Sequence, residues 1–176
     1  MPVLTDADFE AERDASLNAI LASDAPKKLI VAGPGTGKTH TYRTLLKQIN
    51  GSSLAITFLL SLVADLQESL SEFSDVQSFH GFAKKLLHSL CIEGITPAVH
   101  YYPAIDQIYA TDLSIIDRTT SVQEISTALL NLSTDGVIIP GILRSGNYYN
   151  VVGHSDSVYR VFRALEGHPE IVPRYS

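Results

Sequence analysis

The segment that decides the fold is Leu29-Ile30-Val31-Ala32-Gly33-Pro34-Gly35-Thr36-Gly37-Lys38-Thr39-His40. Its apolar beginning predicts a short buried strand over residues 28–32, and the apolar spacing that follows predicts a helix over residues 38–49. Between them, glycines permit positive φ angles and a close approach of backbone N–H groups to a phosphate. A strand, a glycine-rich loop and a helix in this order indicate a nucleoside triphosphate site.

The residues of this segment have distinct expected roles. Lys38 brings a positive charge to the β- and γ-phosphates, and the hydroxyl of Thr39 ligates Mg²⁺. Lys38 and Thr39 are therefore the expected catalytic residues, and ATP and Mg²⁺ are the expected cofactors. A dinucleotide-binding loop does not fit, because its third glycine would fall on Lys38. The full set expected to bind the nucleotide is Gly33, Pro34, Gly35, Thr36, Gly37, Lys38, Thr39 and His40.

Composition sets the limits of this interpretation. The 176 residues suit one domain, or one domain with a small appendage, and 45% of them are hydrophobic. No apolar run approaches the ~20 residues of a membrane span, and the acidic N-terminus resembles neither a secretory nor a mitochondrial signal. The chain has one cysteine, Cys91, which excludes an internal disulfide framework. We therefore expect a cytoplasmic protein with no membrane partner.

The charge is unevenly distributed. The whole chain carries a net charge of −6, which argues against a nucleic-acid surface that covers the entire chain. Residues 25–88 carry seven basic and four acidic side chains, whereas the flanking segments are acidic. The segment that contains the glycine-rich loop is therefore the basic one.

The remaining pattern predicts strands that alternate with helices, followed by a mostly helical segment. Alternation of this kind indicates an α/β fold with a parallel sheet flanked by helices. We place a first domain at residues 1–92 and a second, mostly helical inserted or accessory segment at 93–176. In that segment, Ser121-Val122-Gln123-Glu124 predicts a capping box, and residues 143–154 are expected to form a loop. The other expected helices cover residues 5–23, 61–71, 79–90, 121–132 and 157–165, and the other expected strands cover 53–58 and a short stretch around 76.

Three segments together resemble the beginning of the UvrD/Rep-type superfamily 1 DNA helicases. Ala32–Thr39 is similar to the nucleotide loop of that family, and Leu54-Ala55-Ile56-Thr57-Phe58 is similar to the strand of its motif Ia. Val76-Gln77-Ser78-Phe79-His80-Gly81-Phe82-Ala83 is similar to its T-F-H-S-F-A segment. The resemblance covers about residues 27–90 and implies an incomplete RecA-like P-loop ATPase domain.

The resemblance also implies partners and further site residues. It implies that Phe58 stacks on a base of single-stranded or partly duplex DNA, and that His80 lies near the DNA. From the residues alone, burial of Phe58 in the core and of His80 on an apolar helix are the alternatives. The family completes its active site with an acidic Asp-Glu-x-Gln-Asp segment and a second RecA-like domain. We therefore expect this chain to be the N-terminal piece of a longer helicase, inactive alone.

Some residues depart from the family pattern. Leu59-Leu60-Ser61-Leu62-Val63 replaces a polar turn after motif Ia, and no adenine-reading glutamine stands before the loop. Glu12-Arg13 and Asn18 are weak substitutes for that glutamine, and Asp117 is the one candidate for the Mg²⁺-holding acid. From the residues alone, an ordinary helix or loop acid is the favoured alternative for Asp117. Two other functions stay open, a non-catalytic P-loop interaction module and a small-molecule P-loop kinase. The kinase is disfavoured because residues 50–117 contain no arginine.

Overall fold

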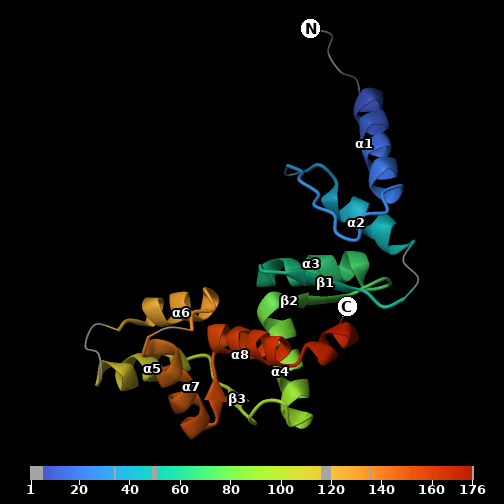
Figure 1. Cartoon of the computed structure of the whole chain (residues 1–176). Helices are drawn as coiled ribbons and strands as arrows, with labels where there is room; N and C mark the ends of the chain where they lie inside the picture. Colours follow the sequence, from blue (N-terminus) through green and yellow to red (C-terminus); the bar gives the residue numbers. More distant parts are fainter. Residues whose placement is uncertain (1–5, 34, 49–50, 116–119, 135, 176) are drawn as a thin grey trace. The chain divides into compact units, whose positions relative to one another are not determined.

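The structure is a computed structural model, and it describes residues 6–33, 35–48, 51–115, 120–134 and 136–175 (Figure 1). Pro34 and Asp117, which the sequence marks as a nucleotide-binding residue and a candidate Mg²⁺ ligand, lie outside these ranges, as does Ile49. The chain divides into two compact units, Met1–Val76 and Gln77–Ser176, which are described separately. This division falls earlier in the chain than the domain boundary expected at residue 92.

Unit 1 contains the glycine-rich loop and few buried residues. Its elements are α1 (Asp6–Leu21), α2 (Lys38–Leu46), β1 (Leu54–Thr57), α3 (Leu60–Leu70) and β2 (Asp75–Ser78), the last of which crosses the division between the units. The helices and these two strands confirm the sequence predictions. β1 and β2 form a two-stranded parallel sheet. Leu70 and Val76 are the buried hydrophobic residues among those that the structure describes in this unit.

The strand predicted over residues 28–32 is wrong. No strand is assigned there, and the side chains of Leu29 and Val31 are 90% and 87% exposed. An isolated apolar run cannot form a strand, because a strand needs a neighbour to accept and donate its backbone hydrogen bonds. Strand β1 does form, but its apolar side chains are not deeply buried, since Leu54 and Ile56 are 40% and 43% exposed. The structure is thus mixed α/β and mostly helical, with small sheets rather than one extended sheet.

Unit 2 is a helical assembly with one small sheet. Its elements are α4 (Phe79–Ile92), β3 (His100–Tyr101), α5 (Ile105–Ser114), α6 (Val122–Leu130), α7 (Ile138–Tyr149), β4 (Val151–Val152), α8 (His154–Gly167) and the 3₁₀ helix η1 (Pro169–Tyr175). β3 and β4 pair in parallel, with His100 opposite Val151 and Tyr101 opposite Val152. The capping box predicted at Ser121 is confirmed, since Ser121 and Glu124 each bond the backbone of the other. The expectation that this part is mostly helical is also confirmed.

Two predictions for unit 2 are wrong in detail. Residues 143–149 belong to helix α7 rather than to a loop, and α5 was not predicted at all. Pro140 argued against a helix in the sequence, because proline usually ends a helix. In α7 it stands in the first turn, where a missing N–H removes no intrahelical hydrogen bond. The helix buries Ile139, Ile142 and Gly146, so its stability comes from packing rather than from intrinsic propensity.

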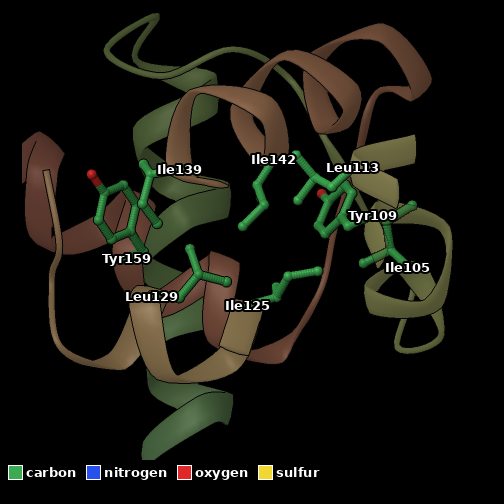
Figure 2. Close-up of a cluster of buried hydrophobic side chains, with 8 residues drawn as sticks. All are labelled: Ile105, Tyr109, Leu113, Ile125, Leu129, Ile139, Ile142 and Tyr159. Atoms are coloured by element: carbon green, nitrogen blue, oxygen red, sulfur yellow. The ribbon is translucent and has the colours of Figure 1, made fainter. Parts of the chain in front are cut away.

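Two apolar clusters hold unit 2 together. The first joins α5, α6, α7 and α8, and Figure 2 shows its eight side chains converging from these helices: Ile105, Tyr109, Leu113, Ile125, Leu129, Ile139, Ile142 and Tyr159. The second joins α4 and α8 with β4 and η1, through residues that include Leu86, Leu90, Val161 and Ile171. Burial of each aliphatic side chain stabilises the fold by roughly 1.5–3 kcal/mol. Unit 2 therefore contains most of the apolar core of the described residues.

A buried polar network lies beside the first cluster. Asp156 is fully buried and accepts hydrogen bonds from Arg160 Nε at 2.8 Å and from the Tyr109 hydroxyl at 2.9 Å. The same guanidinium donates from Nη1 to Asn147 Oδ1 at 2.7 Å. Gly146 makes room for these groups, because a Cβ atom there would lie 2.6 Å from both Arg160 Nη2 and the Tyr109 hydroxyl. The network fixes α5, α7 and α8 in one arrangement.

Candidate functional site

The glycine-rich loop has a backbone that only glycine adopts easily. Gly35 and Gly37 have φ angles of 75° and 79°, in the left-handed region where a side chain is strained. Gly37 is the N-cap residue of α2, so Lys38 is the first residue of that helix and Thr39 the second. The order Gly-Lys-Thr thereby places an ammonium and a hydroxyl at the positive end of a helix dipole.

Hydrogen bonds close the loop on itself. The Thr36 hydroxyl donates to the carbonyl oxygen of Gly33 at 2.8 Å. Lys38 Nζ donates to the carbonyl oxygen of Ala32 at 3.2 Å and also to that of Gly33. The lysine ammonium therefore lies over the beginning of the loop, where neutral carbonyls are its partners. Phosphate oxygens would make stronger, charge-assisted hydrogen bonds with the same ammonium.

The polar side chains at the start of α2 are open to solvent. Lys38, Thr39 and His40 are exposed, and the Thr39 hydroxyl has no hydrogen-bond partner in the part of the chain that the structure describes. That hydroxyl is suited to ligate Mg²⁺ held by a nucleotide. No group of three or more His, Cys, Asp or Glu side chains among the described residues could hold a metal ion by itself. A magnesium ion here would take its other ligands from phosphate and water.

A cavity of about 680 Å³ lies between the loop and α1. Its lining includes Gly35, Thr36 and Gly37 on the loop side, and Arg13 and Leu17 on the helix side. This volume is within the ~300–1,000 Å³ usual for small-molecule sites. Of the substitutes that the sequence offered for an adenine-reading residue, the structure brings Glu12 and Arg13 to the cavity but not Asn18. Sequence reasoning missed Leu17 and Ile20 as cavity residues, although the apolar side of the predicted helix contained both.

Phe58 and His80 belong to different units of the structure. Phe58 directly follows β1 and is 75% exposed, so the alternative that it is buried in the core is wrong. Its neighbours Leu59 and Leu60 are also exposed, at 60% and 76%. Bases of a single strand stack on aromatic rings that are exposed in this way.

His80 is half-buried in the first turn of α4. Its ring makes edge contacts with the rings of Phe79 and His154, at centroid separations of 5.8 and 5.3 Å. Burial lowers the pKa of His80 below its usual value of 6.5, and the nearby His154 lowers this pKa further. No sequence signal predicts His154 as a neighbour of His80, because tertiary packing alone brings it to α4.

Lys84 and Lys85 follow on the exposed side of α4. The Lys84 ammonium lies 4.2 Å from the ring centroid of Tyr101, a cation–π contact. Lys84 is thus engaged with the protein, whereas a phosphate contact would require it to leave this ring.

Neither the models of known protein families nor the curated proteins yield a match to this sequence. None of the helices in the described ranges has the length and apolar character needed to cross a membrane.

Proposed function

We propose that this chain supplies the nucleotide-binding part of an ATP-dependent DNA helicase of the UvrD/Rep type, and that Mg·ATP binds at the glycine-rich loop. The observation that carries the proposal is the position of Lys38 Nζ, which lies over the beginning of the glycine-rich loop. The loop itself has two glycines in the left-handed region, and it ends where Lys38 begins α2. When a triphosphate binds there, the Lys38 ammonium would leave its two carbonyl partners and bind phosphate oxygens instead. Thr39 would ligate the magnesium ion.

The cavity beside the loop supports a nucleotide rather than a simple phosphate. With the phosphates at Gly35–Lys38, the base and ribose would extend toward α1. Leu17 and Ile20 would cover the base, and Arg13 and Glu12 would offer polar contacts at its edge. The RecA-like fold implied by the sequence resemblance fits this placement, with further strands of the sheet and a second RecA-like domain as the expected partners.

A DNA contact by unit 1 is the second part of the proposal. The exposed Phe58 ring would stack on a base of a single strand, and the basic side chains of unit 1 between residues 25 and 76 would attract the DNA backbone. The exposed Leu59 and Leu60 favour another function, a non-catalytic P-loop module that binds a protein partner through this apolar segment.

Calorimetry of the purified chain with Mg·ATP tests the nucleotide site. We expect binding by the wild type, no measurable binding by Lys38→Ala, and unchanged binding by Lys27→Ala, which removes an exposed lysine before the loop. If the wild type has no affinity at millimolar Mg·ATP, or if Lys38→Ala binds as the wild type does, the proposal is wrong. Stimulation of ATP turnover in the complete protein by single-stranded DNA would separate a helicase from the non-catalytic module.

A further inference from the structure

Two helices of unit 2 begin at a pair of histidines. His80 is the second residue of α4, and His154 is the first residue of α8. Their ring centroids are 5.3 Å apart and the ring planes are 80° from parallel, so one ring meets the other by its edge. The two helices also share the second apolar cluster, through Leu86, Leu90 and Val161. The histidine pair therefore joins the first turns of two helices that also share an apolar cluster.

Four other charged or titratable side chains lie on the elements packed around this pair, and of these Tyr101 and Asp106 interact with His154. From β3, the Tyr101 hydroxyl lies 2.7 Å from Nε2 of His154. From α4, the Lys84 ammonium lies 4.2 Å from the centroid of the Tyr101 ring. From α5, Asp106 has a buried oxygen, Oδ1, with no partner among the described residues. Within α8, the buried Asp156 is bound by Arg160.

We propose that the edge contact of His80 with His154 is a pH-sensitive latch, which holds the first turns of α4 and α8 together while His80 is neutral and loosens them when His80 is protonated. Burial of the His80 ring disfavours its charged form, and the neighbouring His154 disfavours that form further. A protonated His80 would also stand at the N-terminus of α4, where the helix dipole disfavours a cation. Histidine is the side chain whose ordinary charge change falls between pH 5 and 8. The latch lies outside the proposed nucleotide site and does not depend on it.

The direction of the pH dependence distinguishes the histidines from the carboxyl groups. Burial and the neighbouring His154 lower the pKa of His80 below 6.5 in the folded chain. The stability that neutral His80 supports is therefore present above pH 6.5 and is lost as the pH falls through the folded-state pKa. Burial raises the pKa of Asp106 and of Asp156 above 3.8, so these two groups favour folding as the pH falls. A loss of order in the first turns of α4 and α8 on mild acidification thus points to His80 rather than to these carboxyl groups.

Amide hydrogen exchange of the full chain at about pH 7.5 and about pH 5.5, corrected for intrinsic exchange rates, tests the latch. We expect protection of the first turns of α4 and α8 to fall at the lower pH in the wild type. In His154→Gln this fall should shrink, and the pKa of His80, followed by the NMR signals of its ring, should rise toward 6.5. His88→Gln, which changes an exposed histidine on α4, should behave as the wild type.

Two results would overturn the proposal. One is an unchanged His80 pKa together with the same pH-dependent loss of protection in His154→Gln. The other is a wild type whose first turns keep their protection at both pH values. If His154→Gln does not fold, His80→Gln takes its place. It should then show no fall in protection between the two pH values, and a fall equal to that of the wild type would exclude the latch.

Discussion

The Tyr109 hydroxyl donates a 2.9 Å hydrogen bond to Asp156 Oδ2, and neither side chain is exposed. These residues stand on α5 and α8, and Arg160 completes the pair by its Nε–H bond to the other carboxylate oxygen. Burial and the nearby Asp156 charge together raise the pKa of Tyr109 far above 10, so the phenol stays protonated and remains a donor. The contact fixes one helix on another at the edge of an otherwise apolar core.

Replacing Arg160 by Met should strongly destabilise unit 2. The substitution leaves the Asp156 carboxylate buried without its cation, which costs on the order of 3–5 kcal/mol. The matched control is Arg163→Met, because Arg163 pairs with Glu166 on the exposed side of the same helix. Such a surface pair contributes about 0–1 kcal/mol. Urea unfolding followed by circular dichroism measures both, and equal midpoints for the two variants would contradict a structural role for the buried pair.

Leu17→Asp should weaken the binding of Mg·ATP by about tenfold, the equivalent of about 1.4 kcal/mol. The reason is that a carboxylate would replace an apolar wall of the cavity on the α1 side. Binding of Mg·tripolyphosphate, which has no base, should not change. Asn18→Asp places the same charge on the next residue of α1, outside the cavity lining, and serves as the control. Equal losses for both ligands would place the base elsewhere.

Binding of single-stranded DNA by this chain should be weak and should fall as salt is raised from about 50 to about 200 mM, since phosphate contacts release counterions. Phe58→Ala should lower the affinity further, by roughly 1–3 kcal/mol for one stacked base, without changing the salt dependence. Fluorescence anisotropy with a labelled oligonucleotide measures both effects. Phe162→Ala, which removes a partly exposed ring of α8, is the control and should have no effect. Tight binding that ignores salt would point to a stacking surface other than Phe58.

The chain by itself should hydrolyse ATP negligibly, with or without DNA. The loop offers Lys38 and Thr39, but the sequence contains no Asp-Glu-x-Gln-Asp segment to orient water. Arginine fingers alone contribute on the order of 10³–10⁵ in rate, and the resemblance assigns these to a second domain. A coupled assay of phosphate release tests this expectation. A Lys38-dependent, DNA-stimulated turnover of about 1 s⁻¹ or more would mean that this chain contains its own Mg²⁺-holding acid, and Asp117 would be the first residue to replace.

The sequence was sufficient where local rules determine the structure. The left-handed turns at Gly35 and Gly37, the start of α2 at Lys38 and the capping box at Ser121 all follow from the preferences of a few adjacent residues. These predictions are confirmed because glycine conformations and helix caps depend on groups within three or four positions of one another.

Only the tertiary structure decided the features that depend on distant partners. The run 28–32 has strand-forming residues but no neighbouring strand, so it is not a strand, and Leu29 and Val31 are exposed. Helix α7 contains a proline and two glycines, yet it forms because Ile139 and Ile142 are buried against α5 and α6. The pairing of His80 with His154, and of Tyr109 with Asp156, likewise has no local signal. Periodicity tells which residues prefer to be buried, whereas the packing of whole helices determines what they are buried against.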